Sequence, residues 1–195
     1  MNAILQRRVS AADYLDWEAR EPVKHEYLMG EVFTVAGARD AHVTVAGNVF
    51  ALLRAHTRGT PCRVYIADMK LQVAEADAFF YPDVFVTCDT RDHGSELFKA
   101  HARLVVEVLS ESTAGFDRGK KFACYRRLES LQEYVIIDTD ARTVDVFRRD
   151  ASGCWVLHPF EGEAIAEFAS LEFQAPLSAL FEDVPPPVIE PEANE

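Results

Sequence analysis

The chain has 195 residues, of which 49% are hydrophobic, and its formal net charge is -12 at pH 7. This length and apolar content are enough for one well-buried core and do not require a second domain. The acidic balance argues against a general polyanion-binding protein, because contacts to phosphates depend on Lys and Arg.

From its sequence we expect neither a membrane span nor an export signal in this chain. No stretch approaches the roughly 18 uninterrupted apolar residues of a membrane span, and no apolar segment follows Arg7 and Arg8. We therefore expect a cytoplasmic protein without a membrane partner. The four cysteines stand singly in the chain: Cys62, Cys88, Cys124 and Cys154. This scatter indicates neither a zinc knuckle nor a disulfide framework, so reduced and mostly buried thiols are expected.

The first part of the chain predicts two helices, with a hairpin between them and two short strands after the second helix. The expected elements are a helix over 10–20, a hairpin of strands 24–28 and 31–35, a helix over 40–58, and strands over 62–66 and 69–73, followed by a connection over 74–80. Ser10 begins a capping-box pattern and Pro22 ends the first helix. Met29-Gly30 supplies the hairpin turn.

The second part predicts the strands that carry the candidate site. The expected elements are strands over 81–87 and 103–110, a helix over 116–128, strands over 133–138, 143–148 and 154–158, and a last helical turn over 177–181. One domain over 1–181 is expected. The remaining residues, 182–195, are acidic and rich in proline, which predicts an extended, poorly ordered tail.

Two carboxylates on predicted strands point to a metal site. Strand 103–110 reads as apolar on both faces, and an ionised Glu107 in its middle must be paired, protonated or bound to a cation. Asp83 lies at the mouth of a second apolar strand, after Pro82. Mg²⁺ prefers oxygen ligands and is often held by one or two carboxylates. If these strands are neighbours, Asp83 and Glu107 can bind one ion, with the Val108 carbonyl as a third ligand.

The ordered motifs resemble a known family. They are Tyr81-Pro82-Asp83-Val84, Val105-Val106-Glu107-Val108-Leu109-Ser110, Ser112-Thr113, Asp117, Lys121, Tyr125 and Glu133-Tyr-Val-Ile-Ile-Asp138, preceded by His25-Glu26-Tyr-Leu-Met-Gly30-Glu31 and His42. This series is similar to the Uma2-like (DUF820) family of proposed restriction endonucleases, within the PD-(D/E)xK nuclease superfamily. The resemblance covers most of the chain.

The resemblance implies both a fold and an activity. The fold would be α/β, with a restriction-endonuclease-like core in which helices flank a mixed sheet. The activity would be metal-dependent cleavage of DNA, with Mg²⁺ or Mn²⁺ as cofactor. Asp83 and Glu107 match the two acidic motif positions, and Glu26 matches the helper carboxylate. A homodimer is expected, because cutting both strands of a duplex suits two-fold symmetry.

The lysine of the family pattern does not transfer directly. Two residues after Glu107 the pattern requires Lys, and this chain has Leu109. Strand alternation places Leu109 on the same face as Glu107, so an apolar group occupies the usual amine position. We expect Lys121, on the following helix, to replace it, with Lys120 as the second candidate. Steps of three and four residues place Lys121 on one half-polar stripe of that helix, together with Asp117, Tyr125 and Leu128.

Other interpretations stay open at this level. The chain could be a nuclease-like domain that binds nucleic acid or a protein without cleaving. Asp83 could begin a strand, Glu107 could pair with a buried Arg or Lys, and Glu26 could face outward. Lys121 and Tyr125 could form a solvated helix edge. We favour a structural, capping role for His42 over phosphate binding. The second D-x-K sequence, Asp68-Met-Lys70, precedes Asp83 against the family order and is ranked low.

Overall fold

The computed structural model describes residues 8–35, 37–110 and 113–185. The α-helices of these residues are α1 (Ala11–Glu18), α2 (Asp40–His56), α3 (Ala114–Phe116), α4 (Phe122–Tyr125) and α5 (Leu177–Leu180). The strands are β1 (His25–Leu28), β2 (Glu31–Thr34), β3 (Arg63–Ile66), β4 (Lys70–Val73), β5 (Ala78–Phe80), β6 (Val84–Thr87), β7 (Phe98–Lys99), β8 (Ala102–Val108), β9 (Glu133–Asp138), β10 (Thr143–Arg149), β11 (Trp155–Phe160), β12 (Ile165–Phe168) and β13 (Phe173–Pro176). None of the helices in these three ranges is long and apolar enough to cross a membrane.

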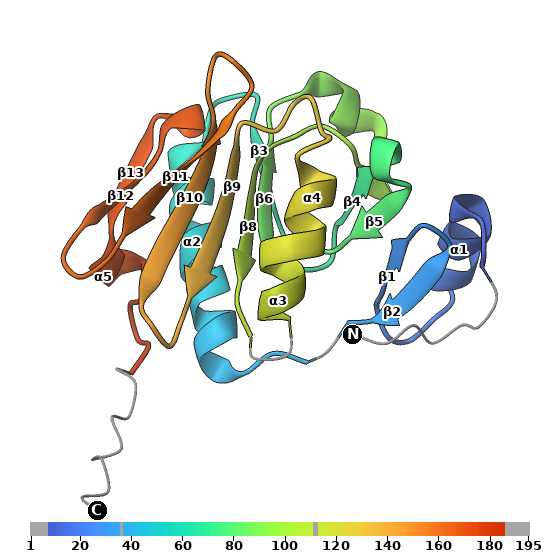
Figure 1. Ribbon diagram of the computed structural model, residues 1–195, viewed down its shortest axis with the longest axis horizontal. Coiled ribbons are helices and arrows are strands. Elements are labelled where there is room, and N and C mark those ends of the chain that lie inside the picture. The colour runs from blue at the N-terminus through green and yellow to red at the C-terminus, as the bar shows by residue number, and fades with distance from the viewer. Residues whose placement is uncertain (1–7, 36, 111–112, 186–195) are drawn as a thin grey trace, which may run out of the picture.

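The described strands form a six-stranded, a five-stranded and a two-stranded sheet. Their orders are β11-β10-β9-β8-β6-β3, β2-β1-β5-β4-β7 and β12-β13. The six-stranded sheet is mixed, because β8 pairs parallel with β9 and antiparallel with β6. Helix α2 covers one face of this sheet, and α3 and α4 lie on the opposite face (Figure 1). The expected α/β fold, a mixed sheet flanked by helices, is therefore confirmed.

Strand β8 is buried on both faces, as its apolar sequence predicts. Leu104, Val106 and Val108 belong to the core beneath α2. Val105 and Leu109 belong to the core beneath the helical segment that follows. Burial of each such side chain contributes roughly 1.5–3 kcal/mol. A slip of one residue would exchange the two faces, so this packing fixes the direction in which Glu107 points.

The helix predicted over 116–128 is one continuous helical segment with an irregular centre. It begins as α3, passes through a π-helical turn over Asp117–Lys121, and ends as α4. π-Helical turns inside α-helices are often found at functional sites. The predicted stripe along this segment is confirmed, because Asp117, Lys121, Tyr125 and Leu128 are all buried.

The structure corrects several predicted elements. Residues 78–80, predicted as part of a connection, form β5 between β1 and β4. Three residues are too few to show a strand period, so only pairing with the neighbours defines this strand. Strands β12 and β13 were also absent from the prediction. Glu182, at the start of the predicted tail, accepts a hydrogen bond from Asn48 of α2. Residues 186–195 of that tail lie outside the described residues.

The prediction of reduced thiols is wrong for two cysteines. Cys62 and Cys88 form a disulfide. Strands β3 and β6 are antiparallel with Arg63 opposite Thr87, so the cysteines are the next residues beyond that pair. Residues 26 positions apart in the chain are thus brought together by sheet pairing, which their spacing did not reveal. The other two cysteines are free: Cys124 is buried and Cys154 is exposed.

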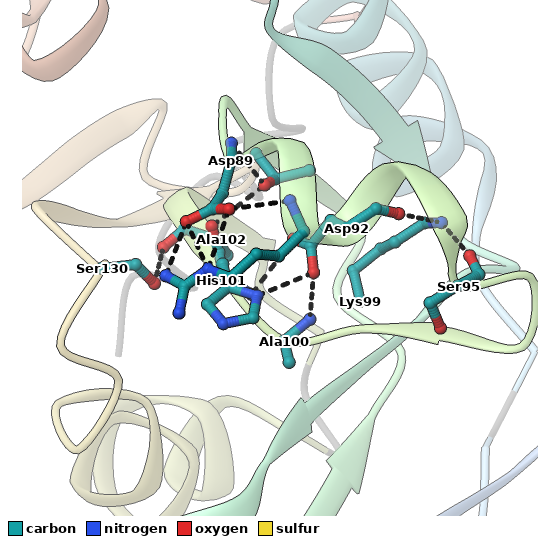
Figure 2. Close-up of polar contacts among 10 residues, drawn as sticks. Asp89, Asp92, Ser95, Lys99, Ala100, His101, Ala102 and Ser130 are labelled. Atoms are coloured by element: carbon teal, nitrogen blue, oxygen red, sulfur yellow. Dashed lines mark hydrogen bonds and ion pairs between the residues drawn. The ribbon is translucent and has the colours of Figure 1, made fainter.

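A buried polar cluster holds the connection between β6 and β8 (Figure 2). Asp92 accepts hydrogen bonds from the backbone N–H groups of Ala100 and His101 and contacts the His101 ring at 2.9 Å. Lys99 donates to the carbonyl oxygens of Asp92 and Ser95. Burial alone would raise the pKa of Asp92, but these hydrogen bonds outweigh it and hold that pKa below its usual value. The ionised carboxylate therefore stabilises the loop.

Replacing Asp92 with Asn is expected to cost about 2 kcal/mol of unfolding free energy at pH 7, because an amide would face the donors with its own N–H group. The carboxylate's stabilisation is present above its unfolded pKa and is lost as the pH falls through its lower folded pKa. The difference between wild type and variant should therefore shrink in acid. Urea unfolding at several pH values measures it. Asp89→Asn, which alters the pair with the exposed Arg91, should cost less, and equal losses would contradict the assignment.

Candidate active site

The two predicted carboxylates lie at the same edge of the six-stranded sheet. Strand β6 runs antiparallel to β8, and Val84 pairs with Val106. Asp83 and Glu107 are the next residues beyond this pair, so strand pairing brings them together across 24 residues of sequence. Helices α2 and α3 begin at this same edge (Figure 1). The hypothesis that the two strands are neighbours is confirmed.

Glu107 points toward the helical segment 114–125. Its Oε1 accepts hydrogen bonds from Lys121 Nζ at 3.2 Å and from the Tyr125 hydroxyl at 2.9 Å. Leu109 is buried on the same face, as strand alternation predicts. An ammonium group therefore lies next to Glu107, on the helix that covers this face and not at position 109. The pairing of a buried Glu with Lys, one of the open interpretations, is present.

Lys121 lies among three carboxylates. Besides Glu107, its Nζ is 3.0 Å from Glu26 Oε1 and 3.4 Å from Asp117 Oδ1. All four side chains are buried. The interpretation of Lys121 and Tyr125 as a solvated helix edge is therefore wrong, and so is the outward orientation of Glu26. Lys120, the second candidate, occupies the preceding helical position and is exposed.

Glu26 joins this cluster from the hairpin β1–β2. Its Oε1 also accepts a hydrogen bond from the Tyr81 backbone N–H at 3.1 Å. Its Oε2 is buried and has no hydrogen-bond partner among the described residues. Burial raises the pKa of Glu26, although the charge of Lys121 opposes this shift. A carboxylate held in this way has one oxygen available for a further cation.

Asp83 connects the cluster to solvent. Its Oδ2 accepts a hydrogen bond from the Val108 backbone N–H at 2.8 Å, and its Oδ1 is 2.9 Å from His42 Nε2. The Asp83 side chain is 21% exposed. Burial alone would lower the pKa of His42, but the hydrogen bond to Asp83 and nearby carboxylate charge raise it. His42 contacts the site, and α2 has no side-chain cap, so the preferred capping role is wrong.

A cleft of about 590 Å³ opens onto these groups, and we call it the carboxylate cleft. Four carboxylates line it together with Lys121: Glu26, Asp83, Glu107 and Asp117. Burial raises the pKa of Glu107 well above its usual value. The other three carboxylates add to this shift, and Lys121 opposes it. The cleft thus gathers four acidic side chains, and three of them, Glu26, Glu107 and Asp117, contact the Lys121 ammonium.

The donor set fits a hard divalent cation. Within the described ranges, no three His, Cys, Asp or Glu side chains are already arranged as a complete ligand set. Mg²⁺ does not require one, because it commonly keeps several waters and uses one or two carboxylates. Asp83 and Glu107 supply carboxylate oxygens at adjacent strand ends, and these are the ligands that such a cation prefers. Asp68 of the second D-x-K sequence is exposed and pairs with Lys24 beside the cleft, but Asp68 is not among the residues that line it.

Sequence reasoning missed two members of this site. Asp117 was placed on the helical stripe but was given no role, although its four-residue spacing from Lys121 was a usable signal. His42 contacts Asp83 only because α2 packs beside the start of β6. No local pattern indicates that contact.

Comparison with known proteins identifies the family of this chain. The family model described as Uma2, "Putative restriction endonuclease", matches residues 11–178. The chain belongs to the Uma2 family. Two similar relatives are the Synechocystis sp. (strain ATCC 27184 / PCC 6803 / Kazusa) proteins slr1290 and sll1609. The first is 33% identical over 84% of this chain and 86% of the relative, and the second is 34% identical over 85% and 92%.

A solved structure shows the same fold as this Uma2 chain. It is the crystal structure of "a putative nuclease belonging to DUF820" from Anabaena variabilis ATCC 29413. The two match with a TM-score of 0.70 at 19% sequence identity, over 86% of this chain and 96% of the other. The family resemblance inferred from the motifs is therefore confirmed, and the shared fold extends over nearly the whole neighbour.

Proposed function

We propose that this Uma2 protein is a metal-dependent endonuclease that hydrolyses DNA phosphodiester bonds. The observation that carries the proposal is the meeting of Asp83 and Glu107 at adjacent strand ends, with Lys121 in contact with Glu107 and a solvent-open cleft beside them. The family description supports nuclease chemistry. The carboxylate-rich lining of this cleft supports a metal-assisted route.

The proposed roles follow from the contacts of each residue. Asp83, Glu107 and the Val108 carbonyl would hold Mg²⁺, with Mn²⁺ as an alternative. A bound ion of this kind polarises a phosphoryl oxygen and lowers the pKa of a bound water. Lys121 would orient the attacking water and offset the negative charge that develops on the phosphate. Glu26 holds the Lys121 ammonium at 3.0 Å and is assigned as a positioning residue.

Plasmid cleavage tests the proposal. The purified protein is expected to nick or linearise supercoiled DNA in Mg²⁺ or Mn²⁺ and to lose this activity in EDTA. Asp83→Ala and Glu107→Ala should abolish it. Asp68→Ala removes the aspartate of the other D-x-K sequence and should cut as the wild type does. Cutting that Asp83→Ala and Glu107→Ala retain would come from a contaminating nuclease.

A second candidate is a domain that binds nucleic acid or a protein without cleaving. The buried Leu109 at the usual lysine position favours it. The same preparation distinguishes the two. DNA binding without cutting in any divalent metal would support the binding module and contradict the endonuclease.

The homodimer remains part of the proposal, since a nuclease that cuts both strands of a duplex benefits from two-fold symmetry. Light scattering coupled to size-exclusion chromatography is expected to give twice the chain mass of 21.9 kDa. A single-chain mass at the concentration that cuts plasmid would contradict it.

A further inference from the structure

The mouth of the carboxylate cleft carries an apolar rim. The described residues leave eight large apolar side chains exposed, and three of them line this one cleft. These are Val23, Val43 and Ile66, with exposed fractions of 49%, 58% and 36%. Exposed apolar residues scattered singly need no explanation, but a group at a cleft indicates a binding surface.

The three rim residues come from separate parts of the chain. Val23 precedes β1, Val43 lies in the first turns of α2, and Ile66 ends β3. The rim is therefore assembled by the tertiary fold at the same edge that assembles the carboxylates. One cleft joins an apolar surface at its mouth to the charged groups at its floor.

The cationic groups of the cleft are already engaged. Among its described lining residues the lysines are Lys24 and Lys121. Lys24 Nζ is 2.8 Å from Asp68 Oδ1, and Lys121 contacts three carboxylates. Duplex DNA is bound largely through many contacts of Lys and Arg to phosphates. This cleft, in a chain of net charge -12, offers few of them.

We propose that the carboxylate cleft takes an unpaired nucleobase, so that the substrate is single-stranded DNA or a locally opened duplex. The base would pack against Val23, Val43 and Ile66, while its adjoining phosphate approaches Asp83 and Glu107. An unpaired base presents an apolar face that a stacked duplex hides, and such faces bind apolar and aromatic side chains with little dependence on sequence. This inference rests on the proposed nuclease function and specifies its substrate.

Binding and cutting are measured separately to test it. The probes are a fluorescent oligonucleotide of about 12 nucleotides, the same strand as a duplex, and the same strand with abasic positions at its centre. Anisotropy is recorded with Ca²⁺ in place of Mg²⁺, and cleavage of the same probes is followed in Mg²⁺. The variants are Val43→Thr, which keeps the side-chain size, and Ile66→Thr, which also removes one methyl group. Val156→Thr, at an exposed position on β11 outside the cleft, is the matched control, and thermal unfolding verifies that each variant folds.

We expect the single strand to bind at least about tenfold more tightly than the duplex. Val43→Thr and Ile66→Thr should each weaken single-strand binding about three- to tenfold, and abasic positions should weaken it similarly. Val156→Thr should bind as the wild type does. Equal or tighter duplex binding, or rim variants without effect, would overturn the inference. Duplex cutting without a single-strand preference would refute the substrate class and leave the nuclease. Single-strand preference without cutting in any metal would refute the nuclease and leave the binding of an unpaired base.

Discussion

Glu107→Gln is expected to abolish DNA cleavage and to increase the stability of the folded protein. The substitution removes a proposed metal ligand, and the metal's contribution of several kcal/mol corresponds to a loss of about 10³-fold or more in rate. It also removes one of three carboxylates that share the Lys121 ammonium in a buried cluster. A buried charge with incomplete compensation is costly, so the neutral amide should stabilise the fold.

The expected gain is about 1 kcal/mol, or roughly 2–4 °C in Tm for a chain of this size. Cleavage of labelled DNA and thermal unfolding without divalent metal measure the two effects on one preparation. Glu133→Gln is the matched control. Glu133 is fully buried, but its oxygens accept bonds from Arg148, Ala169 and Ser170. That variant should lose stability and, while folded, keep its activity. A destabilised Glu107→Gln that still cuts DNA would identify Glu107 as a structural residue.

Lys121→Met is expected to reduce both cleavage and stability. Lys121 is the cation in contact with Glu26, Glu107 and Asp117 within the described structure. Burial would lower its pKa, but these carboxylates raise that pKa well above its usual value, so the ammonium stays charged. Its loss leaves three buried carboxylates without their counter-charge. Breaking a buried pair in this way costs about 3 kcal/mol or more, or roughly 6–12 °C in Tm.

The catalytic loss should be about 10²–10³-fold, as for removal of one group that stabilises developing charge. Rates are measured below the unfolding temperature of the variant. Lys120→Met changes the exposed neighbour and should match the wild type in both measurements. Adding Glu26→Gln to Lys121→Met removes one unbalanced carboxylate and should restore part of the stability without restoring cleavage. A folded Lys121→Met protein that cuts at the wild-type rate would remove Lys121 from the mechanism.

The strand elements of the site could be predicted because their signals are local. The apolar run of β8 has to be buried on both faces, and a carboxylate within it requires a partner whatever the rest of the chain does. Asp117, Lys121 and Tyr125 share one side of a helix because of their four-residue spacing. The order of these motifs was enough to indicate the family. By contrast, β5, β12 and β13 are short strands whose sequences carry little periodicity.

The sequence by itself determined which residues carry the charge of the site and which strand must be buried. Tertiary structure alone decided their partners. Pairing of β6 with β8 brings Asp83 next to Glu107, and packing of α2 brings His42 to Asp83. Pairing of β3 with β6 brings Cys62 next to Cys88. The physical reason is that burial and helix spacing act through neighbours in the chain. Strand pairing and helix packing join segments whose separation in sequence leaves no local signal.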